Sequence, residues 1–277
     1  MKYAIFLCFL ISSLSAEPEV FLTPNDCLFV TYPVPERGIV CSNFDRVMRL
    51  AEKLSEKEIH KTSWGPVVIT GTYKNHPIFI AAASVGTGSG LLFTELYVAG
   101  ARYIIRYGSD DVKLPPDSDA YLVKIVDEAD NLYGFNQQSG VAPEEWGKSV
   151  FASEKIVQAL MDEAKTKKIN YEMRVCHHLE NYHGLRQPEK YNEDRCKRLQ
   201  EQLAVLKQHP KQASFDMETA VLFRIAKDFD AHAATVLQTV SKEPLNQALT
   251  PQQEFQRTCR LEQELFFPYV LDALLRL

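Results

Sequence analysis

The stretch QASFDMETAVLFRIA, residues 212–226, places two carboxylates directly before a long apolar segment. Asp216 and Glu218 flank Met217, and the apolar residues that follow have the spacing of a buried helix. Acidic and hydroxyl side chains suit the free N–H groups of a helix N-terminus, so Ser214 or Asp216 is expected to cap this helix. The same carboxylates are good acceptors for the paired hydroxyls of ribose, with Met217 as a flexible apolar wall. This stretch alone leaves both interpretations open.

Segments with strand and helix character alternate along the rest of the chain. Strands are expected at 27–34, 38–42, 65–73, 76–84, 102–111, 121–129, 170–178 and 233–242. Amphipathic helices are expected at 43–58, 91–101, 153–168, 195–208 and 251–277, besides the helix of the opening stretch. Residues 65–73 and 76–84 are expected to form a hairpin. The alternation predicts one α/β domain, with a central β-sheet flanked by helices.

The composition is that of an ordinary globular protein. The chain has 277 residues, of which 45% are hydrophobic and 24% are charged. Its 31 basic and 36 acidic side chains give a net charge of −5, and the sequence contains no long basic block. We therefore expect no nucleic-acid partner.

The first residues have the pattern of a secretory signal peptide. Lys2 is followed by an apolar run from Tyr3 to Ile11 and then by small residues that end at Ala16. This pattern predicts a signal peptide at 1–16, cleaved near Ala16, followed by a secreted or periplasmic domain at 17–277. The apolar run is too short to span a bilayer, so no stable membrane insertion is expected. A buried N-terminal strand or helix is the alternative.

Six cysteines are present, and Cys8 lies within the expected signal peptide. The others show no C-x-x-C spacing, so they do not predict a zinc site. In an oxidising compartment they can form one or two disulfides. Cys27–Cys41 and Cys176–Cys196 are candidate pairs that the sequence cannot select.

Polar and glycine-rich segments follow several of the expected strands, where ligands collect in an open α/β sheet. Arg46 and Arg106 offer fork-shaped donors that suit phosphate, and Ser109 adds a hydroxyl group. Gly108 and the segment VGTGSG, residues 85–90, let backbone N–H groups approach an anion. Together these residues predict a phosphate site.

Four segments in this order resemble the nucleoside phosphorylase family, which includes uridine phosphorylase and the hexameric purine nucleoside phosphorylases. They are DRV at 45–47, VGTGSG at 85–90, AGARYIIRYGS at 99–109 and FDMETAVLFRIA at 215–226. The resemblance extends over residues 38–245. It implies a nucleoside phosphorylase-like fold, a single α/β domain with a mixed central β-sheet flanked by helices, assembled as a homodimer or homohexamer.

The resemblance also assigns roles to residues at the phosphate position. Ser42, Arg46, Arg106 and Ser109 would bind phosphate, with Ser109 in place of the family's threonine. Arg106 and Glu218 would be the catalytic residues. The implied reaction is phosphorolytic cleavage of the N-glycosidic bond of a nucleoside, which yields free base and ribose 1-phosphate. Inorganic phosphate would be the co-substrate, with no metal and no organic cofactor.

Asp216, Met217 and Glu218 would hold the ribose, with Asp216 where the family has glutamate. Once bound, phosphate would attack C1′ while the positive charge that develops on the sugar is stabilised by fixed charges.

The base side of the site resembles the pyrimidine enzymes more than the purine enzymes. Gln187 and Lys190 stand where uridine phosphorylases have a Gln-x-Arg pair, spaced one residue wider, and Tyr182 could stack on the base. Purine enzymes of the family use an aspartate at the position of Lys242. The resemblance therefore favours a uridine-like substrate.

Two departures from the family leave other functions open. Asp110 and Asp111 replace small residues beside the presumed phosphate, where carboxylates repel an anion. The segment that often supplies an arginine from a neighbouring subunit contains none here. A nucleosidase that uses water, or a non-catalytic nucleoside-binding or storage protein on the same fold, are the alternatives.

Overall fold

The computed structural model describes residues 29–61, 65–110, 122–239 and 251–277. The expected signal peptide at 1–16, together with Cys27, Asp111 and Lys242, lies outside the described residues.

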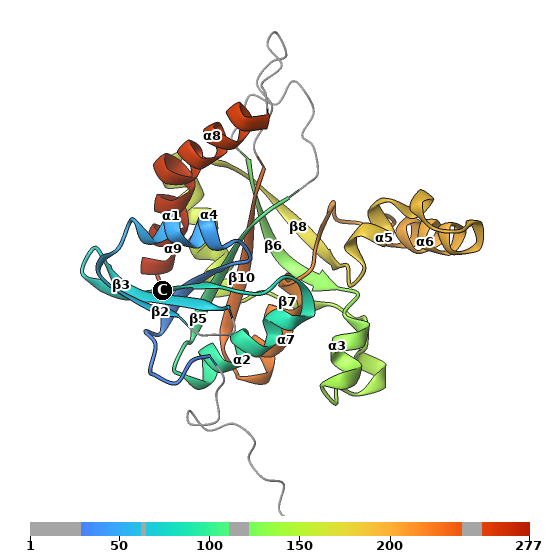
Figure 1. Ribbon diagram of the computed structural model, residues 1–277, viewed down its shortest axis with the longest axis horizontal. Helices are drawn as coiled ribbons and strands as arrows, with labels where there is room; N and C mark the ends of the chain where they lie inside the picture. The colour runs from blue at the N-terminus through green and yellow to red at the C-terminus, as the bar shows by residue number, and fades with distance from the viewer. Residues whose placement is uncertain (1–28, 62–64, 111–121, 240–250) are drawn as a thin grey trace, which may run out of the picture.

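One mixed β-sheet runs through the centre of the molecule (Figure 1). Its order is β2-β3-β4-β1-β5-β10-β6-β8-β9, with β7 paired to β6. β2, β3 and β4 pair antiparallel in turn, whereas β4, β1, β5 and β10 are parallel to one another. β10 pairs antiparallel with β6, and β6, β8 and β9 are again parallel. The strands are β1 (Arg37–Cys41), β2 (Ser55–Lys61), β3 (Val67–Tyr73), β4 (His76–Ala82), β5 (Tyr103–Ser109), β6 (Leu122–Asp130), β7 (Val150–Phe151), β8 (Asn170–His178), β9 (Ala213–Asp216) and β10 (His232–Thr239).

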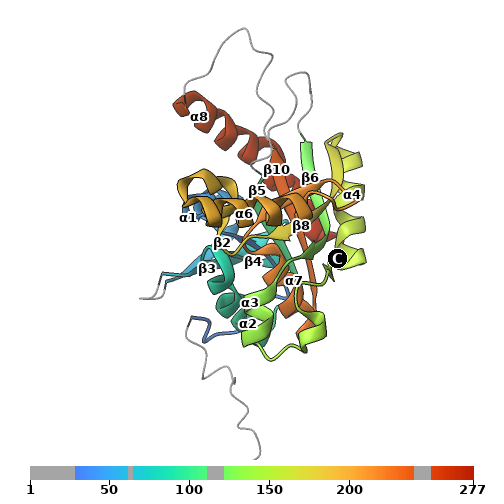
Figure 2. The ribbon, with the colours of Figure 1, turned by 90° about the vertical axis from the view of Figure 1, so that its right-hand side faces the viewer.

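Helices cover both faces of the sheet, and one group of helices projects from the body (Figures 1 and 2). α1, α4 and α9 contribute to the apolar cluster on one face, whereas α2 and α7 contribute to the cluster on the other. The projecting part contains α5 and α6. The helices are α1 (Phe44–Ala51), α2 (Ser89–Val98), α3 (Tyr133–Gln138), α4 (Glu154–Lys167), α5 (Tyr182–Arg186), α6 (Glu193–Leu206), α7 (Thr219–Asp228), α8 (Pro251–Leu261) and α9 (Phe267–Leu275).

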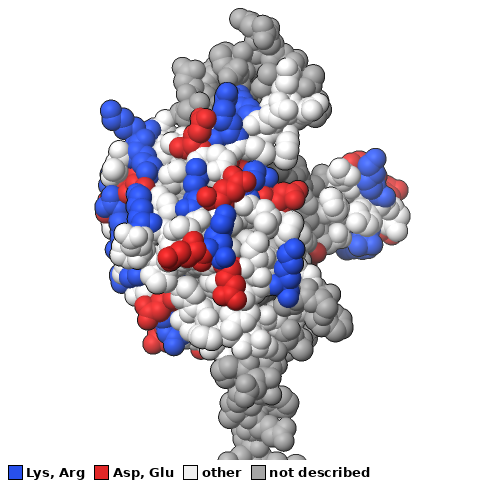
Figure 3. Space-filling model, turned by 60° about the vertical axis from the view of Figure 1, so that its left-hand side comes forward, with Lys and Arg blue, Asp and Glu red and all other residues white. Residues whose placement is uncertain are grey.

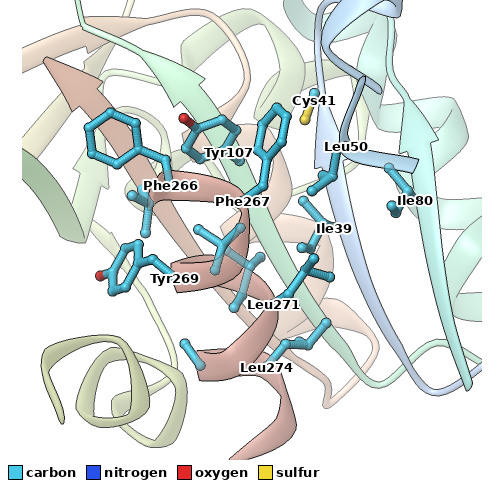
Figure 4. Packing of buried hydrophobic residues seen from close by; sticks show 14 of the residues in the cluster. Ile39, Cys41, Leu50, Ile80, Tyr107, Phe266, Phe267, Tyr269, Leu271 and Leu274 are labelled. Carbon is cyan, nitrogen blue, oxygen red and sulfur yellow. The ribbon is translucent and has the colours of Figure 1, made fainter. Parts of the chain in front are cut away.

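Helix α9 fills the centre of the first apolar cluster (Figure 4). Phe267 meets the ring of Tyr107 on β5 edge-on, with ring centroids 5.7 Å apart. Phe267, Tyr269 and Leu271 are fully buried against strand residues such as Ile39. Burial of each such side chain contributes about 1.5–3 kcal/mol. This packing fixes the C-terminal segment against the ends of β1 and β5.

The predicted hairpin is confirmed, because Tyr73 of β3 pairs with His76 of β4. The turn uses Lys74 and Asn75, both with positive φ. Two other predictions are wrong. The helix expected at 43–58 ends at Ala51, and residues 29–34 of the strand expected at 27–34 have no strand structure.

The misassigned residues 55–58 belong to the edge strand β2, whose side chains are mostly exposed. Because most of its side chains are exposed on both faces, this strand lacks the alternation of apolar and polar residues that indicates a strand in a sequence. Its place in the sheet is specified by pairing with β3.

Cys41, Cys176, Cys196 and Cys259 are free thiols. The candidate disulfides Cys27–Cys41 and Cys176–Cys196 are therefore not formed. Cys41 and Cys176 are buried and behave as small apolar side chains at the ends of their strands.

Basic and acidic side chains are interspersed on the face that Figure 3 shows, so that face presents no broad area of one charge. Among the described residues, no helix has both the length and the apolar character needed to cross a bilayer.

Candidate functional site

Arg106 lies at the centre of a buried cluster of charges. It belongs to β5 between Val40 of β1 and Thr235 of β10, and it is 4% exposed. Its Nη1 lies 2.9 Å from Asp216 Oδ2, and its Nη2 donates a hydrogen bond to Glu218. The Arg106 Nε–H has no acceptor among the described residues, so one buried donor is left for another partner.

The charge of Arg106 is maintained by its acidic partners. Burial alone would lower its pKa, but Asp216 and Glu218 raise it above its ordinary value. Burial likewise opposes the charge on Asp216, yet Arg106 and hydrogen bonds from Thr219 hold the pKa of that carboxyl below its ordinary value. Arg106 and Asp216 are therefore both ionised at neutral pH.

Asp216 also caps helix α7, as one of the two alternatives for this stretch predicted. Its Oδ1 accepts hydrogen bonds from the backbone N–H groups of Glu218 (3.3 Å) and Thr219 (3.2 Å). Ser214 is not the cap, because it lies within β9 and its hydroxyl donates to Asp110 (2.6 Å). Capping and contact with Arg106 occupy both Asp216 oxygens.

The glycine-rich turn reaches the same cluster. The N–H of Gly86 donates to Glu218 Oε1 at 2.8 Å, across 132 residues of sequence. Gly86 has a φ of +78°, which an L-residue rarely adopts, and Met217 Cε lies 3.5 Å from where its Cβ would stand. Gly108 is required for another reason, since a Cβ there would lie 2.7 Å from Arg106 Nη1.

Arg46 and Ser109 form a second cluster. The first turn of α1 is capped by Asn43, which accepts from the Arg46 N–H (2.9 Å). The Arg46 side chain donates from Nη2 to Ser109 Oγ (2.6 Å) and from Nε to Glu262 Oε1 (2.7 Å). Burial opposes its charge, but Tyr107 and Glu262 raise its pKa. Arg46 is therefore already paired with a carboxylate of the chain itself.

The two arginines approach the end of β5 from opposite faces of the sheet. Tyr107 belongs to the apolar cluster under α9, whereas Ile104, on the same face of the strand as Arg106, belongs to the cluster under α2 and α7. Both guanidinium groups lie near Cys41 at the end of β1. Burial raises the pKa of that thiol to about 12, and Arg46 and Arg106 oppose the rise. The arginines thus share one edge of the sheet.

Asp110 does not face the predicted phosphate site as an uncompensated charge. Its carboxylate pairs with Lys124, which is fully buried, and accepts from Ser214. Lys124 neutralises the negative charge that the sequence placed beside the phosphate. Asp111 lies outside the described residues.

His178 was not among the predicted site residues. It ends β8, is 0% exposed, and neither ring nitrogen has a hydrogen-bond partner among the described residues. Burial lowers its pKa, and the carboxylates of Asp216, Glu180 and Glu218 oppose this shift only in part, so the imidazole is neutral. Its position at a strand end was the only signal that the sequence offered.

A cavity of about 340 Å³ lies between the glycine-rich turn and helix α3. Thr87 and Gly88 line it next to Gly86, and Glu180 lines it two residues beyond His178. Phe135 and Gln138 of α3 form the opposite wall.

The predicted base-binding residues lie in helix α5 and in the segment that follows it. Tyr182 is half-buried in α5, whereas Gln187 and Lys190 are exposed in the turn that follows. This segment adjoins the helices that project from the body (Figure 1). Ser42 is partly buried in the link between β1 and α1. The structure therefore joins Arg106 to the predicted ribose residues Asp216 and Glu218, and joins Arg46 to Ser109. The predicted base residues belong to a different segment of the chain.

The architecture matches known enzymes. No protein-family model matches the sequence, and no curated protein matches it either. Two solved structures of uridine phosphorylase from Vibrio fischeri ES114 are similar to this chain, and one of them is complexed with 6-hydroxy-1-naphthoic acid. Each match has a TM-score of 0.65 and 20% sequence identity, and it covers 96% of this chain and 98% of that chain. The expectation from the motifs is therefore confirmed for the architecture: this chain has the single-domain α/β fold of uridine phosphorylase.

Proposed function

We propose that this chain cleaves the N-glycosidic bond of a pyrimidine nucleoside such as uridine, with inorganic phosphate as the acceptor of the ribosyl group. The observation that carries the proposal is the meeting of Arg106, Glu218 and the Gly86 N–H at one buried point. Three distant segments supply these groups, and the family resemblance implies phosphate binding for Arg106 and ribose binding for Glu218.

In the proposed reaction, phosphate attacks C1′ as the C–N bond breaks, and the bonding electron pair leaves with the base. The sugar becomes cationic along this path. The Glu218 carboxylate would accept a hydrogen bond from a ribose hydroxyl and so hold the sugar, while Arg106 positions the phosphate. The unpartnered Nε–H of Arg106 supports this role, because a bound oxyanion would satisfy it.

The leaving base acquires negative charge and needs a donor. Gln187 and Lys190 are proposed to polarise a uracil carbonyl, with Tyr182 stacked on the ring. Gln187 and Lys190 are exposed in the segment after α5, so this role requires that segment to close over a nucleoside bound at Arg106.

The test is a panel of purine and pyrimidine nucleosides assayed for free base, with and without inorganic phosphate. We expect phosphate-dependent release of uracil from uridine, and an Arg106→Ala variant that has lost nearly all of it. If no nucleoside releases base, the catalytic proposal fails, and nucleoside binding without turnover would identify a binding or storage protein.

Hydrolysis is the second candidate, and one observation favours it. Arg46 is paired with Glu262, and Arg106 is paired with Asp216 and Glu218, so neither guanidinium faces the site without a carboxylate partner. Such neutralised cations attract phosphate less strongly than free ones do. Base release at the same rate with and without phosphate would select hydrolysis.

We also propose that the protein is exported after cleavage of residues 1–16 and that it assembles as a homodimer or homohexamer. Mass spectrometry of the exported protein would locate its first residue, and sedimentation analysis would measure the oligomeric state.

A further inference from the structure

The carboxylate of Glu262 is surrounded by hydrogen-bond donors, as a bound anion would be. It is 0% exposed and begins the π-helical turn Glu262–Phe266, between α8 and α9. Its Oε1 accepts from Arg46 Nε (2.7 Å) and Gln238 Nε2 (2.9 Å). Its Oε2 accepts from Arg49 Nε (3.2 Å) and Arg49 Nη2. Four N–H donors from three side chains therefore surround one carboxylate, which is the arrangement that an oxyanion requires.

The neighbouring groups hold this carboxylate in place. Gln238 of β10 is itself fixed by the hydroxyl of Tyr107, which donates to Gln238 Oε1. Phe266 and Phe267, which follow within the same turn and the start of α9, are fully buried. Glu262 therefore cannot leave Arg46 by a simple rotation of an exposed side chain, because the backbone that carries it is packed into the core.

The net charge of the cluster around Glu262 determines how strongly it attracts phosphate. Arg46 and Arg49 carry two positive charges and Glu262 carries one negative charge, so the cluster keeps a single net positive charge. A phosphate at Ser109 would share Arg46 with Glu262 and would be repelled by that carboxylate in a weakly screened environment.

We infer that Glu262 is a specificity-determining residue that weakens the binding of phosphate to Arg46 and thereby sets how far water competes with phosphate as the ribosyl acceptor. This inference rests on the proposed function for its catalytic consequence, but its binding consequence does not depend on turnover. Glu262 acts through Arg46 and contacts no reacting atom, so it is a positioning residue.

The first experiment measures the dissociation constant of inorganic phosphate by calorimetry at constant ionic strength. The variant is Glu262→Gln, which removes the charge and nearly preserves the shape. We expect it to bind phosphate at least tenfold more tightly than the wild type. Glu264→Gln is the matched control, because Glu264 lies in the same turn but is exposed, and we expect its phosphate affinity to equal that of the wild type. Unchanged or weaker phosphate binding by folded Glu262→Gln overturns the inference.

A second variant, Arg46→Gln, tests the same inference from the side of the arginine, first in the wild-type background. If Glu262 masks Arg46, then Arg46→Gln should change the phosphate affinity of the wild type less than threefold, and it should abolish the gain in the Glu262→Gln background. A tenfold loss of affinity from Arg46→Gln in the wild-type background would show that Arg46 already binds phosphate freely, and the inference would be wrong. This arm decides the matter even if Glu262→Gln fails to fold.

The kinetic readout separates this inference from the proposed function. For an active enzyme, Glu262→Gln should lower the KM for phosphate without changing the KM for uridine, a split that general damage to the fold would not produce. If the wild type releases no base but the phosphate affinities change as expected, the proposed function fails and the role of Glu262 in anion binding stands. If base is released and the phosphate affinities do not change, the proposed function stands and the inference about Glu262 fails.

Discussion

Arg106 and Glu218 lie 112 residues apart in the sequence, yet their side chains meet in the interior of the protein through a charge-assisted hydrogen bond. Asp216 engages the same guanidinium from the other side, at 2.9 Å. One cation therefore holds β5 to the link between β9 and α7. This contact has consequences for stability as well as for ligand binding.

Removal of this cation should destabilise the protein strongly. Arg106→Ala leaves Asp216 and Glu218 buried without their partner, and we expect a loss of about 3–5 kcal/mol in the free energy of unfolding. Urea denaturation followed by circular dichroism measures this value. Arg102→Ala is the control, because Arg102 is exposed at the start of the same strand, and it should cost less than about 1 kcal/mol. Equal losses for the two variants would contradict the central role of Arg106.

Substitutions of Lys124 and Asp110 should have non-additive effects on the free energy of unfolding. Lys124→Met removes a fully buried ammonium group and leaves the Asp110 carboxylate without its cation, so we expect a loss of about 3–5 kcal/mol. The double variant Lys124→Met with Asp110→Leu removes both charges and should be more stable than Lys124→Met alone. Unfolding in urea compares the variants. Additive losses would show that the two groups do not interact.

His178 should make stability depend on pH. Its folded pKa lies below the ordinary value of 6.5 because the ring is buried. As the pH falls below 6.5 the unfolded chain takes up a proton that the folded protein does not, so the free energy of unfolding should decrease. The decrease is about 1.4 kcal/mol for each unit by which folding lowers the pKa.

His178→Met should remove this component of the pH dependence, measured by urea titrations between pH 7 and pH 5. His183→Asn should retain it, because His183 is exposed in the folded protein as in the unfolded chain. A wild type whose stability is constant over this range would refute the assignment.

Gly108 should be intolerant of even a methyl group. In Gly108→Ala, the new Cβ would lie 2.7 Å from Arg106 Nη1 and 2.9 Å from Leu237 Cδ2. Two carboxylates fix the Arg106 side chain, so it cannot yield freely, and we expect a loss of about 1–3 kcal/mol in stability. Gly88→Ala is the control for stability, since its nearest neighbour, Ser84 Cβ, is 3.9 Å away. Thermal unfolding that is equal for both variants would contradict the steric argument.

Local patterns were sufficient to predict the parts of the fold that carry their own signals. Asp216 before an apolar run predicted the capped helix α7, and the short turn between two β-rich runs predicted the β3–β4 hairpin. The exposed strand β2 has no such signal, since its identity depends on pairing with β3. The sequence pattern therefore predicts a helix that continues through these residues, where the structure has an edge strand.

In the site, too, only residues that stand in a recognisable sequence segment could be predicted. Arg106 and Glu218 could be proposed from motifs, because each stands in a recognisable segment. Glu262 could not, since its role arises from a contact with Arg46 across 216 residues and from the π-helical turn that buries it. Lys124 was missed for a similar reason, because a lysine within an apolar strand becomes meaningful only when Asp110 is seen beside it.

The position of α9 constrains how the protein can be made. Strands β1 and β5 lie beneath a helix that follows every strand in chain order, so the part of the sheet that α9 covers stays exposed while ribosomes are still translating the preceding residues. We expect the nascent polypeptide to expose apolar strands until Phe267–Leu275 has emerged, and to depend on chaperones during that interval. Ribosome-bound chains arrested before Phe267 should be cleaved rapidly by protease, whereas chains extended until α9 has cleared the exit tunnel should resist.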